Sequence, residues 1–313
     1  MTQQAVLIAG PTASGKTALA LGLASILVNR GKPVAIINTD SMQLYREIPV
    51  LSAQPAPEER GGIAHHLYGT VPAARPFSTG AWLDAVTPLV EGFRRDGIVP
   101  LFVGGTGLYF RALTQGLATI PAIPAAIREG LRAEHRDTPA PALFALLERR
   151  DPLTAGRLRT RDKQRILRAL EVLEATGRPL AAFQEEEPAT PPLIDPDAAA
   201  RFVLDPPRDW LRERITRRIG AMMEAGAFDE ARAFAALKLP ADAPAAKAIG
   251  LKELSAHLSG MCDLHTALEA MDTATRRYAK RQETWFRHQM PGWQRIDPAG
   301  GDALQHMAHT IAG

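Results

Sequence analysis

The sequence predicts an α/β fold in which a parallel sheet is joined to an all-helical insertion. Short apolar runs alternate with amphipathic stretches, a pattern typical of sheets whose strands are buried on both faces. Between residues 120 and 198 no convincing strand is found, and the helical patterns there lie between proline-rich edges. We therefore expect a core of residues 1–119 and 199–313 and a helical insertion of residues 120–198.

The core elements are expected to alternate along the chain. In order, they are a strand at 5–10, a helix from Lys16 to about Arg30, a strand at 34–38, a helix over 78–96 capped by Ser78 or Thr79, strands at 98–103 and 201–205, and helices over 208–236 and 263–288. Within the insertion, residues 141–150 and 161–176 have helical patterns.

Composition excludes several classes of protein. The single cysteine, Cys262, excludes an internal disulfide framework and a zinc site built on several thiolates. No apolar run reaches the roughly 18 residues of a membrane helix, and the amino terminus lacks a signal-peptide pattern, so we expect a cytoplasmic protein. We also expect a monomer. Because the net charge is only +3, a polyanionic partner must be met by local basic clusters.

Residues 10–17, GPTASGKT, fit the P-loop pattern G-x-x-x-x-G-K-[ST], with a strand before them and a helix after them. The loop amides and the helix amino terminus favour a phosphate group, Lys16 adds a cation, and the Thr17 hydroxyl can bind Mg²⁺. The core is therefore expected to be P-loop NTPase-like. The predicted diphosphate-binding residues are Gly10, Pro11, Thr12, Ala13, Ser14, Gly15, Lys16 and Thr17.

Two further motifs fall at the carboxyl ends of predicted strands, where open α/β sheets place their ligands. Asp40 begins DSMQLYR at 40–46, and GGTGLY occupies 104–109. Asp40 can serve in catalysis or metal binding, or it can cap the following helix. The motifs alone leave both interpretations open.

The combination of motifs resembles the tRNA dimethylallyltransferase (tRNA isopentenyltransferase) family of bacterial type. The matching segments are GPTASGKT at 10–17, DSMQLYR at 40–46, LFVGGTGLYFRAL at 101–113, DKQRILRALEV at 162–172, RERITRRIGAMMEAG at 212–226, AIGLKEL at 248–254 and AKRQETWFR at 279–287. The segment at 47–59 departs from the family pattern, and Gln54 stands where the family has a lysine.

The resemblance implies transfer of a dimethylallyl group from dimethylallyl diphosphate to the exocyclic amine of the tRNA adenine 3′ of the anticodon. It implies Asp40 as general base, Thr106 as the group that orients the adenine, and Lys16 and Arg218 as cations that stabilise the leaving diphosphate, with Mg²⁺ as cofactor. Arg218 has an alternative interpretation as part of a solvated helix face.

Basic clusters predict where tRNA binds. Six basic residues lie between Arg157 and Arg168, and a second cluster from Arg276 to Arg287 is interleaved with Tyr278, Trp285 and Phe286. Either basic cluster can instead be a solvated helix face, and the aromatic residues of the second cluster can belong to the core. With the resemblance, the predicted tRNA-binding residues are Asp40, Ser41, Met42, Gln43, Thr106, Arg128, Gln164, Arg165, Ile166, Leu167 and Arg168.

Two other activities share the P-loop. A prenyltransferase acting on free adenine nucleotides would need the P-loop and Asp40 but no basic helical insertion. A P-loop kinase or hydrolase, or a non-catalytic nucleotide-dependent RNA-binding protein, would turn over or bind nucleotide without a prenyl donor.

Overall fold

The computed structural model describes residues 4–158, 162–186, 191–240 and 243–312. The chain forms two compact units, one of residues 1–114 and 192–313 and the other of residues 115–191. Both boundaries of the second unit lie earlier in the chain than the expected insertion of 120–198. At the far boundary the reason is packing in the core unit, where Ile194 is buried and its N–H donates to the carbonyl of Leu113 at 3.0 Å.

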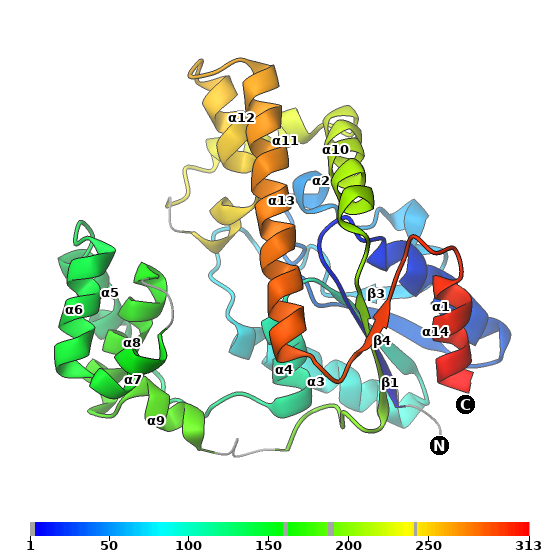
Figure 1. The fold of residues 1–313 in the computed structure, drawn as a ribbon, viewed down its shortest axis with the longest axis horizontal. Coiled ribbons are helices and arrows are strands. Elements are labelled where there is room, and N and C mark those ends of the chain that lie inside the picture. The colour runs from blue at the N-terminus through cyan, green and yellow to red at the C-terminus, as the bar shows by residue number, and fades with distance from the viewer. Residues whose placement is uncertain (1–3, 159–161, 187–190, 241–242, 313) are drawn as a thin grey trace. The chain divides into compact units, whose positions relative to one another are not determined.

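The core unit contains a six-stranded sheet of order β3-β2-β4-β1-β5-β6, in which every neighbouring pair is parallel. Figure 1 shows β1 among the strands at the centre of this unit. The predicted α/β class with a parallel sheet is confirmed. The strands are β1 (Ala5–Ala9), β2 (Val34–Asn38), β3 (Ala64–His66), β4 (Val99–Gly104), β5 (Ala199–Leu204) and β6 (Gln294–Ile296).

The four central strands were predicted from their apolar runs, and the two edge strands were missed. All residues of β1 and β2 are buried. The edge strands are three residues long, with the sequences AHH and QRI, and they are only partly buried. Because an edge strand pairs on one side only, it needs no long apolar run, so the apolar pattern could not reveal it.

Helices cover both faces of the sheet. Along β1, Val6 and Ile8 belong to one buried cluster together with residues of the first and last helices, and Leu7 belongs to a second cluster. Figure 1 shows these two helices, α1 and α14, side by side. The helices of the core unit are α1 (Lys16–Asn29), α2 (Pro49–Ser52), α3 (Thr79–Asp96), α4 (Gly107–Gln115), α10 (Arg208–Glu224), α11 (Ala227–Ala236), α12 (Leu251–Leu258), α13 (Leu264–Gln289) and α14 (Ala303–Ala312), with 3₁₀ turns η1 (Pro57–Arg60) and η2 (Pro244–Lys247).

Two of the predicted long helices have different outcomes. The helix expected over 263–288 is α13, and the Asp263 side chain caps it by accepting from Thr266 N–H at 2.7 Å. The helix expected over 208–236 is two helices, α10 and α11. The break is at Gly226, whose φ of +95° lies in the left-handed region that favours glycine.

The second unit consists of helices around a core of its own. Leu143, Leu147, Ile166 and Leu170 are fully buried in this core. Its helices are α5 (Ala125–Glu134), α6 (Ala140–Arg150), α7 (Pro152–Arg157), α8 (Lys163–Thr176) and α9 (Leu180–Glu185). No helix in the described part of the chain is long and apolar enough to cross a membrane.

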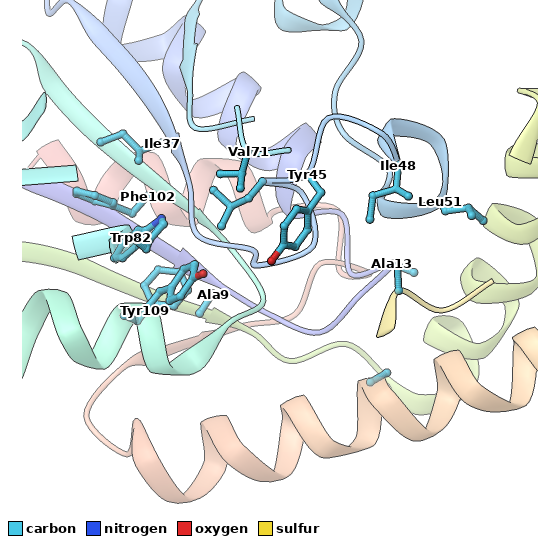
Figure 2. Close-up of a cluster of buried hydrophobic side chains, with 14 of the residues drawn as sticks. Ala9, Ala13, Ile37, Tyr45, Ile48, Leu51, Val71, Trp82, Phe102 and Tyr109 are labelled. Carbon is cyan, nitrogen blue, oxygen red and sulfur yellow. The ribbon is translucent and has the colours of Figure 1, made fainter. Parts of the chain in front are cut away.

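A stacked aromatic pair lies beneath the ends of β2 and β4. The rings of Trp82 and Tyr109 are 4.3 Å apart and nearly parallel, and both side chains are buried (Figure 2). The Trp82 indole N–H donates to the carbonyl of Asn38 at 3.1 Å. Asn38 in turn holds the next turn of the chain, because its side chain accepts from Asp40 N–H at 2.7 Å and donates to the carbonyl of Asp40 at 2.9 Å.

Candidate active site

The core unit contains a cavity of about 790 Å³ above the P-loop. Its polar wall includes Lys16, Thr17, Asp40 and Arg218, which come from the P-loop, the turn after β2 and α10. Apolar side chains line another part of the same cavity. These are Leu51, Ile215, Ile219, Met222 and Met271. A ligand with a charged head and a short hydrocarbon tail matches this lining.

The P-loop connects β1 to α1 through two left-handed residues, Ala13 at φ +61° and Gly15 at φ +88°. Gly10 is required for a different reason. A Cβ at Gly10 would lie 2.9 Å from both Leu204 Cβ and Ser14 Oγ, closer than real Cβ atoms approach. The sequence motif therefore gives the compact loop expected of it, with the amino terminus of α1 lining the cavity.

Only some of the predicted diphosphate-binding residues line the cavity. The N–H of Thr12 donates to Gln282 Oε1 at 2.9 Å, and the N–H of Ser14 donates to the carbonyl of Pro11 at 3.3 Å. The Ser14 side chain is fully buried. The loop thus presents to the cavity Thr12, Ala13, Gly15, Lys16 and Thr17, while Gly10, Pro11 and Ser14 shape the loop from behind.

Lys16 is close enough to Asp40 and Arg218 for both to act on its pKa. Its Nζ donates to the carbonyl of Pro11 at 2.6 Å. The side chain reaches the cavity but is densely surrounded by protein, and this burial lowers the pKa of Lys16 to about 7. Asp40 acts in the opposite direction on this pKa, and Arg218 acts in the same direction as burial. A lysine in this state gains its full charge when an anion binds beside it.

Asp40 is at the rim of the cavity, as the sequence predicted. Its Oδ1 accepts from Met42 N–H at 3.0 Å in an Asx turn, which leaves Oδ2 without that bond. The next helix, α2, begins only at Pro49, so Asp40 does not cap it. Of the two interpretations that the sequence left open, helix capping is excluded.

Three glycines of the GGTG segment leave room for neighbouring groups. A Cβ at Gly104 would lie 2.2 Å from Thr39 C, and one at Gly107 would lie 2.1 Å from the Trp285 ring. A Cβ at Gly105 would lie 2.2 Å from Gln282 Nε2 and 3.2 Å from Asp40 Oδ2. The segment is glycine-rich because the turn after β2 and α13 both pack against its backbone.

Thr106 lies behind the cavity lining rather than on it. Its Oγ1 accepts from Ser41 N–H at 2.9 Å and donates to Ser41 Oγ at 3.3 Å. Ser41, Met42 and Gln43 do line the cavity. Thr106 therefore connects the GGTG segment to the residue that follows Asp40, and its hydroxyl can orient a ligand through Ser41.

Arg218 extends from α10 into the cavity wall. Burial lowers the pKa of its guanidinium, Asp40 opposes this shift, and Arg214 adds to it. Because Arg218 is partly buried and lines the cavity, it is not part of a solvated helix face. Arg214 is a second cation that the sequence did not single out, and its Nε donates to the carbonyl of Ala13 at 2.9 Å. A sign of it is present in the sequence, because Arg214 lies one helical turn before Arg218.

Gln282 is a further site residue that the sequence did not single out, although it lies in the AKRQETWFR segment. Its buried side chain accepts from Thr12 N–H and donates to the carbonyl of Gly105, both at 2.9 Å. One amide group thereby joins the P-loop to the loop after β4. A glutamine in a helical segment rich in basic residues gives no signal for such a role, since its partners are backbone atoms far away in sequence.

Replacing Gln282 with methionine should lower the free energy of unfolding by about 1–3 kcal/mol, because the buried carbonyl of Gly105 then loses its partner. Urea denaturation monitored by circular dichroism measures this change. The matched control is Gln289→Met, at an exposed position near the end of the same helix, which we expect to leave the unfolding free energy within about 0.5 kcal/mol of the parent. Equal effects of the two substitutions would contradict the bridging role.

The oxygen donors at the cavity fit a magnesium ion bound together with a phosphate ligand. Thr17 and Asp40 line the same cavity. Among the described residues no cluster of three or more His, Cys, Asp or Glu side chains could hold a metal ion. Mg²⁺ commonly binds through one or two protein oxygens and completes its shell with water and substrate phosphates. The donor set therefore suits the predicted Mg²⁺ only when a diphosphate is also bound.

Comparison with known proteins identifies the family. A profile described as IPP transferase matches residues 43–289, and one described as isopentenyl transferase matches residues 3–68. The chain belongs to the IPP transferase family. A tRNA dimethylallyltransferase from Rhizobium meliloti is 48% identical over 294 residues, which cover 94% of this chain and 95% of that protein. One from Agrobacterium fabrum is 49% identical, covering 94% and 97%.

Solved structures of IPP transferases have the same fold. The full-length tRNA isopentenylpyrophosphate transferase from Bacillus halodurans has 31% sequence identity and a TM-score of 0.70, covering 99% of this chain and 96% of that one. A eukaryotic dimethylallyltransferase, solved acting on tRNA, has 25% identity and a TM-score of 0.81, covering 99% and 77%. The predicted P-loop NTPase-like fold and the predicted family are confirmed.

The first basic cluster lies in the helical unit. Arg159 and Arg161 lie outside the described residues. Gln164 and Arg165 are exposed on α8, Arg168 is partly exposed there, and Arg128 is exposed on α5. Ile166 is fully buried in the core of the unit and Leu167 packs against that core. The side chain of Ile166 is therefore unavailable to RNA, contrary to the prediction, because it faces inward from the helix that carries the arginines.

The second basic cluster divides between two environments. Tyr278 and Arg281 line the cavity, with the guanidinium carbon of Arg281 5.5 Å from the Tyr278 ring centre. Phe286 is buried in the core, and Trp285 packs over Gly107. The core interpretation holds for these last two aromatics. Tyr278 and Arg281 are therefore positioned to contact a ligand in the cavity, while the other basic residues of the cluster are exposed outside it.

Proposed function

We propose that this chain transfers a dimethylallyl group from dimethylallyl diphosphate to the exocyclic amine of the tRNA adenine that lies 3′ of the anticodon. Its relatives are named tRNA dimethylallyltransferases, and this supports tRNA over free adenine nucleotides as acceptor. The observation that carries the chemistry is the meeting of Lys16, Asp40 and Arg218 at one cavity whose other lining is apolar. The predicted cytoplasmic location stays a prediction.

The diphosphate of the donor fits the polar part of the cavity, and its hydrocarbon tail fits the apolar part. The amides at the start of α1, Lys16 and Arg218 bind the diphosphate, whose charge grows as the bond to the allylic carbon breaks. Ile215, Ile219 and Met271 enclose the five-carbon tail and exclude water from the reacting carbon. Thr17 would hold Mg²⁺, which supplies further neutralisation of the leaving diphosphate.

The acceptor approaches from the side of Asp40. The amine nitrogen attacks the allylic carbon, the C–O bond breaks, and its electron pair leaves with the diphosphate. Asp40 Oδ2 takes the proton that the amine loses, while Oδ1 stays bound to Met42 N–H. Thr106 orients the base through its bonds to Ser41. To reach this position the adenine must leave its stack and enter the cavity.

The helical unit is proposed to hold the tRNA. Arg128, Gln164, Arg165 and Arg168 are exposed or partly exposed on its helices α5 and α8. Arginine side chains suit the phosphate groups of an RNA backbone and carry little sequence information. They would secure the anticodon arm while the core unit performs the transfer.

One assay tests the proposed function. The full-length protein is incubated with Mg²⁺, labelled dimethylallyl diphosphate and unmodified tRNA, and the tRNA is digested to nucleosides. We expect label in isopentenyladenosine only, from the position next to the anticodon. Equal transfer to AMP would favour an adenine-nucleotide prenyltransferase, and ATP turnover without a prenyl donor would favour a kinase or hydrolase. Either result would reject the proposal.

The lowered pKa of Lys16 predicts proton uptake when a diphosphate binds. Above pH 7 the free protein holds Lys16 mostly neutral, and the bound anion raises its pKa again. At about pH 8.5 we expect Lys16 to take up about one proton per bound diphosphate, and its contribution to the affinity to weaken as the pH rises above 7. Calorimetric titration with inorganic diphosphate in buffers of different ionisation enthalpy measures the uptake.

The matched control for this titration is Lys16→Arg, because arginine stays charged throughout this pH range. It should bind diphosphate with no proton uptake assignable to residue 16. The same uptake in both proteins would show that Lys16 is charged before the ligand binds. Lys16 also affects the stability of the ligand-free protein. The free energy of unfolding should rise as the pH rises from about 7 towards 10.5, because in this range Lys16 is protonated in the unfolded chain and neutral in the folded one.

A further inference from the structure

A buried carboxylate in the helical unit is surrounded by three arginines. The side chain of Glu171 on α8 is only 2% exposed. Its Oε1 lies 3.1 Å from Arg132 Nε, and its Oε2 lies 3.6 Å from Arg168 Nη1 and 4.0 Å from Arg128 Nε. Arg128 and Arg132 come from α5, so the cluster joins two helices of one compact unit.

The cluster has more positive charge than the carboxylate can neutralise. Three guanidinium groups share one negative charge, and an excess of two positive charges remains. The three arginine side chains are 44%, 49% and 41% exposed, whereas Glu171 lies beneath them. Each guanidinium has five N–H donors, so each keeps donors directed to solvent after its contact with Glu171.

A purely structural ion pair between α5 and α8 would need only one arginine, because a single partner compensates a buried carboxylate. The other two add mutual repulsion, which weakens the unit unless an anion binds. A planar guanidinium matches the oxygens of a phosphate group in geometry as well as in charge. The arrangement therefore suits a ligand that brings several phosphate groups.

We propose that Glu171 positions Arg128, Arg132 and Arg168 as a single site for phosphate groups of the tRNA backbone. This inference rests on the proposed function for its partner, and it adds Arg132 and Glu171 to the residues that the sequence singled out. Glu171 acts through the arginines and does not itself touch the RNA. An acidic protein surface is the other polyanion that three arginines could bind, and the binding experiment below distinguishes it.

The same helix offers a matched control. Glu174 lies one turn after Glu171 and pairs with one arginine, Arg150, at 2.6 Å. Both members of this pair are exposed, at 45% for Glu174 and 40% for Arg150. Glu171→Gln and Glu174→Gln thus remove the same charge from the same helix, but only the first releases the three arginines.

The experiment measures tRNA binding by the full-length protein through fluorescence anisotropy at several salt concentrations. Simple electrostatics predicts that both substitutions strengthen binding, because each makes the protein more positive. The proposal predicts the opposite sign for Glu171→Gln alone: Kd rises about tenfold, and the slope of log Kd against log salt falls by about 1 to 2, as when one or two phosphate contacts are lost. Glu174→Gln should keep the parent slope.

A second pair of substitutions, at exposed side chains, tests the proposal without changing a buried residue. Arg132→Gln changes a half-exposed side chain and should lower the salt slope by about 1, whereas Arg150→Gln should not. Equal binding by Glu171→Gln and Glu174→Gln, with parent-like thermal unfolding, would overturn the proposal, as would an unchanged slope in Arg132→Gln. A parent protein that binds tRNA but transfers no prenyl group would reject the proposed function instead.

Discussion

Replacing Asp40 with asparagine should lower the turnover number by about 10² or more when donor and tRNA are both saturating. Asparagine has the same shape, and its Oδ1 can still accept from Met42 N–H, so the Asx turn that holds the residue is kept. What is lost is the ability of Oδ2 to take the proton of the attacking amine. Steady-state kinetics with labelled donor and unmodified tRNA measures the effect.

The control for this substitution is Asp84→Asn, at an exposed position on α3. It removes the same charge at a distance from the cavity lining and should keep the parent turnover number. Binding of inorganic diphosphate to Asp40→Asn should also persist, because the P-loop is unchanged. Near-parent turnover by Asp40→Asn at saturation would mean that another group accepts the proton, and the proposed mechanism would fail.

Replacing Lys16 with alanine should lower kcat/KM for dimethylallyl diphosphate by about 10² to 10³, the range for loss of one group that stabilises developing charge. The loss should be largest below pH 7 and should shrink as the pH rises above 7, because kcat/KM reflects the free enzyme, in which the pKa of Lys16 is about 7. Thermal stability should not fall, because a buried ammonium group whose pKa is lowered to about 7 destabilises the folded protein.

Lys252→Ala, at an exposed position on α12, is the matched control for Lys16→Ala. It should keep the parent kcat/KM. The affinity of Lys16→Ala for tRNA should also match the parent, because the helical unit is proposed to supply most of that binding. A loss confined to tRNA binding, with unchanged use of the donor, would place Lys16 outside the diphosphate site.

The sequence predicted those parts of the fold in which burial is continuous. The strand around Ile36 and the strand that precedes the P-loop are apolar at nearly every position, and a strand buried on both faces leaves that pattern. The pattern was insufficient at Gly226, where a helical periodicity continues across a left-handed residue and hides the break between α10 and α11. A glycine inside a long amphipathic stretch was the available sign.

For the site, motif residues were placed correctly where the motif is a loop with its own geometry. Lys16 and Asp40 reach one cavity because the P-loop follows β1 and the turn with Asp40 follows β2. Both strands end at the same edge of the parallel sheet, with β4 between them. Residues whose partners are remote in sequence were not identified. Gln282 forms hydrogen bonds to backbone atoms 270 and 177 positions away. Glu171 forms ion pairs with two arginines of α5, a different helix.

The bond between Leu113 and Ile194 has a consequence for how this chain can vary. The chain leaves the core unit just after Leu113 and has returned to it at Ile194, and these two residues are hydrogen-bonded to each other. The helical unit is therefore an insertion whose two ends lie close together. Lengthening, shortening or exchanging that insertion leaves every strand pairing intact. The helical unit can therefore diverge in length and sequence without altering the strand pairings that position the P-loop.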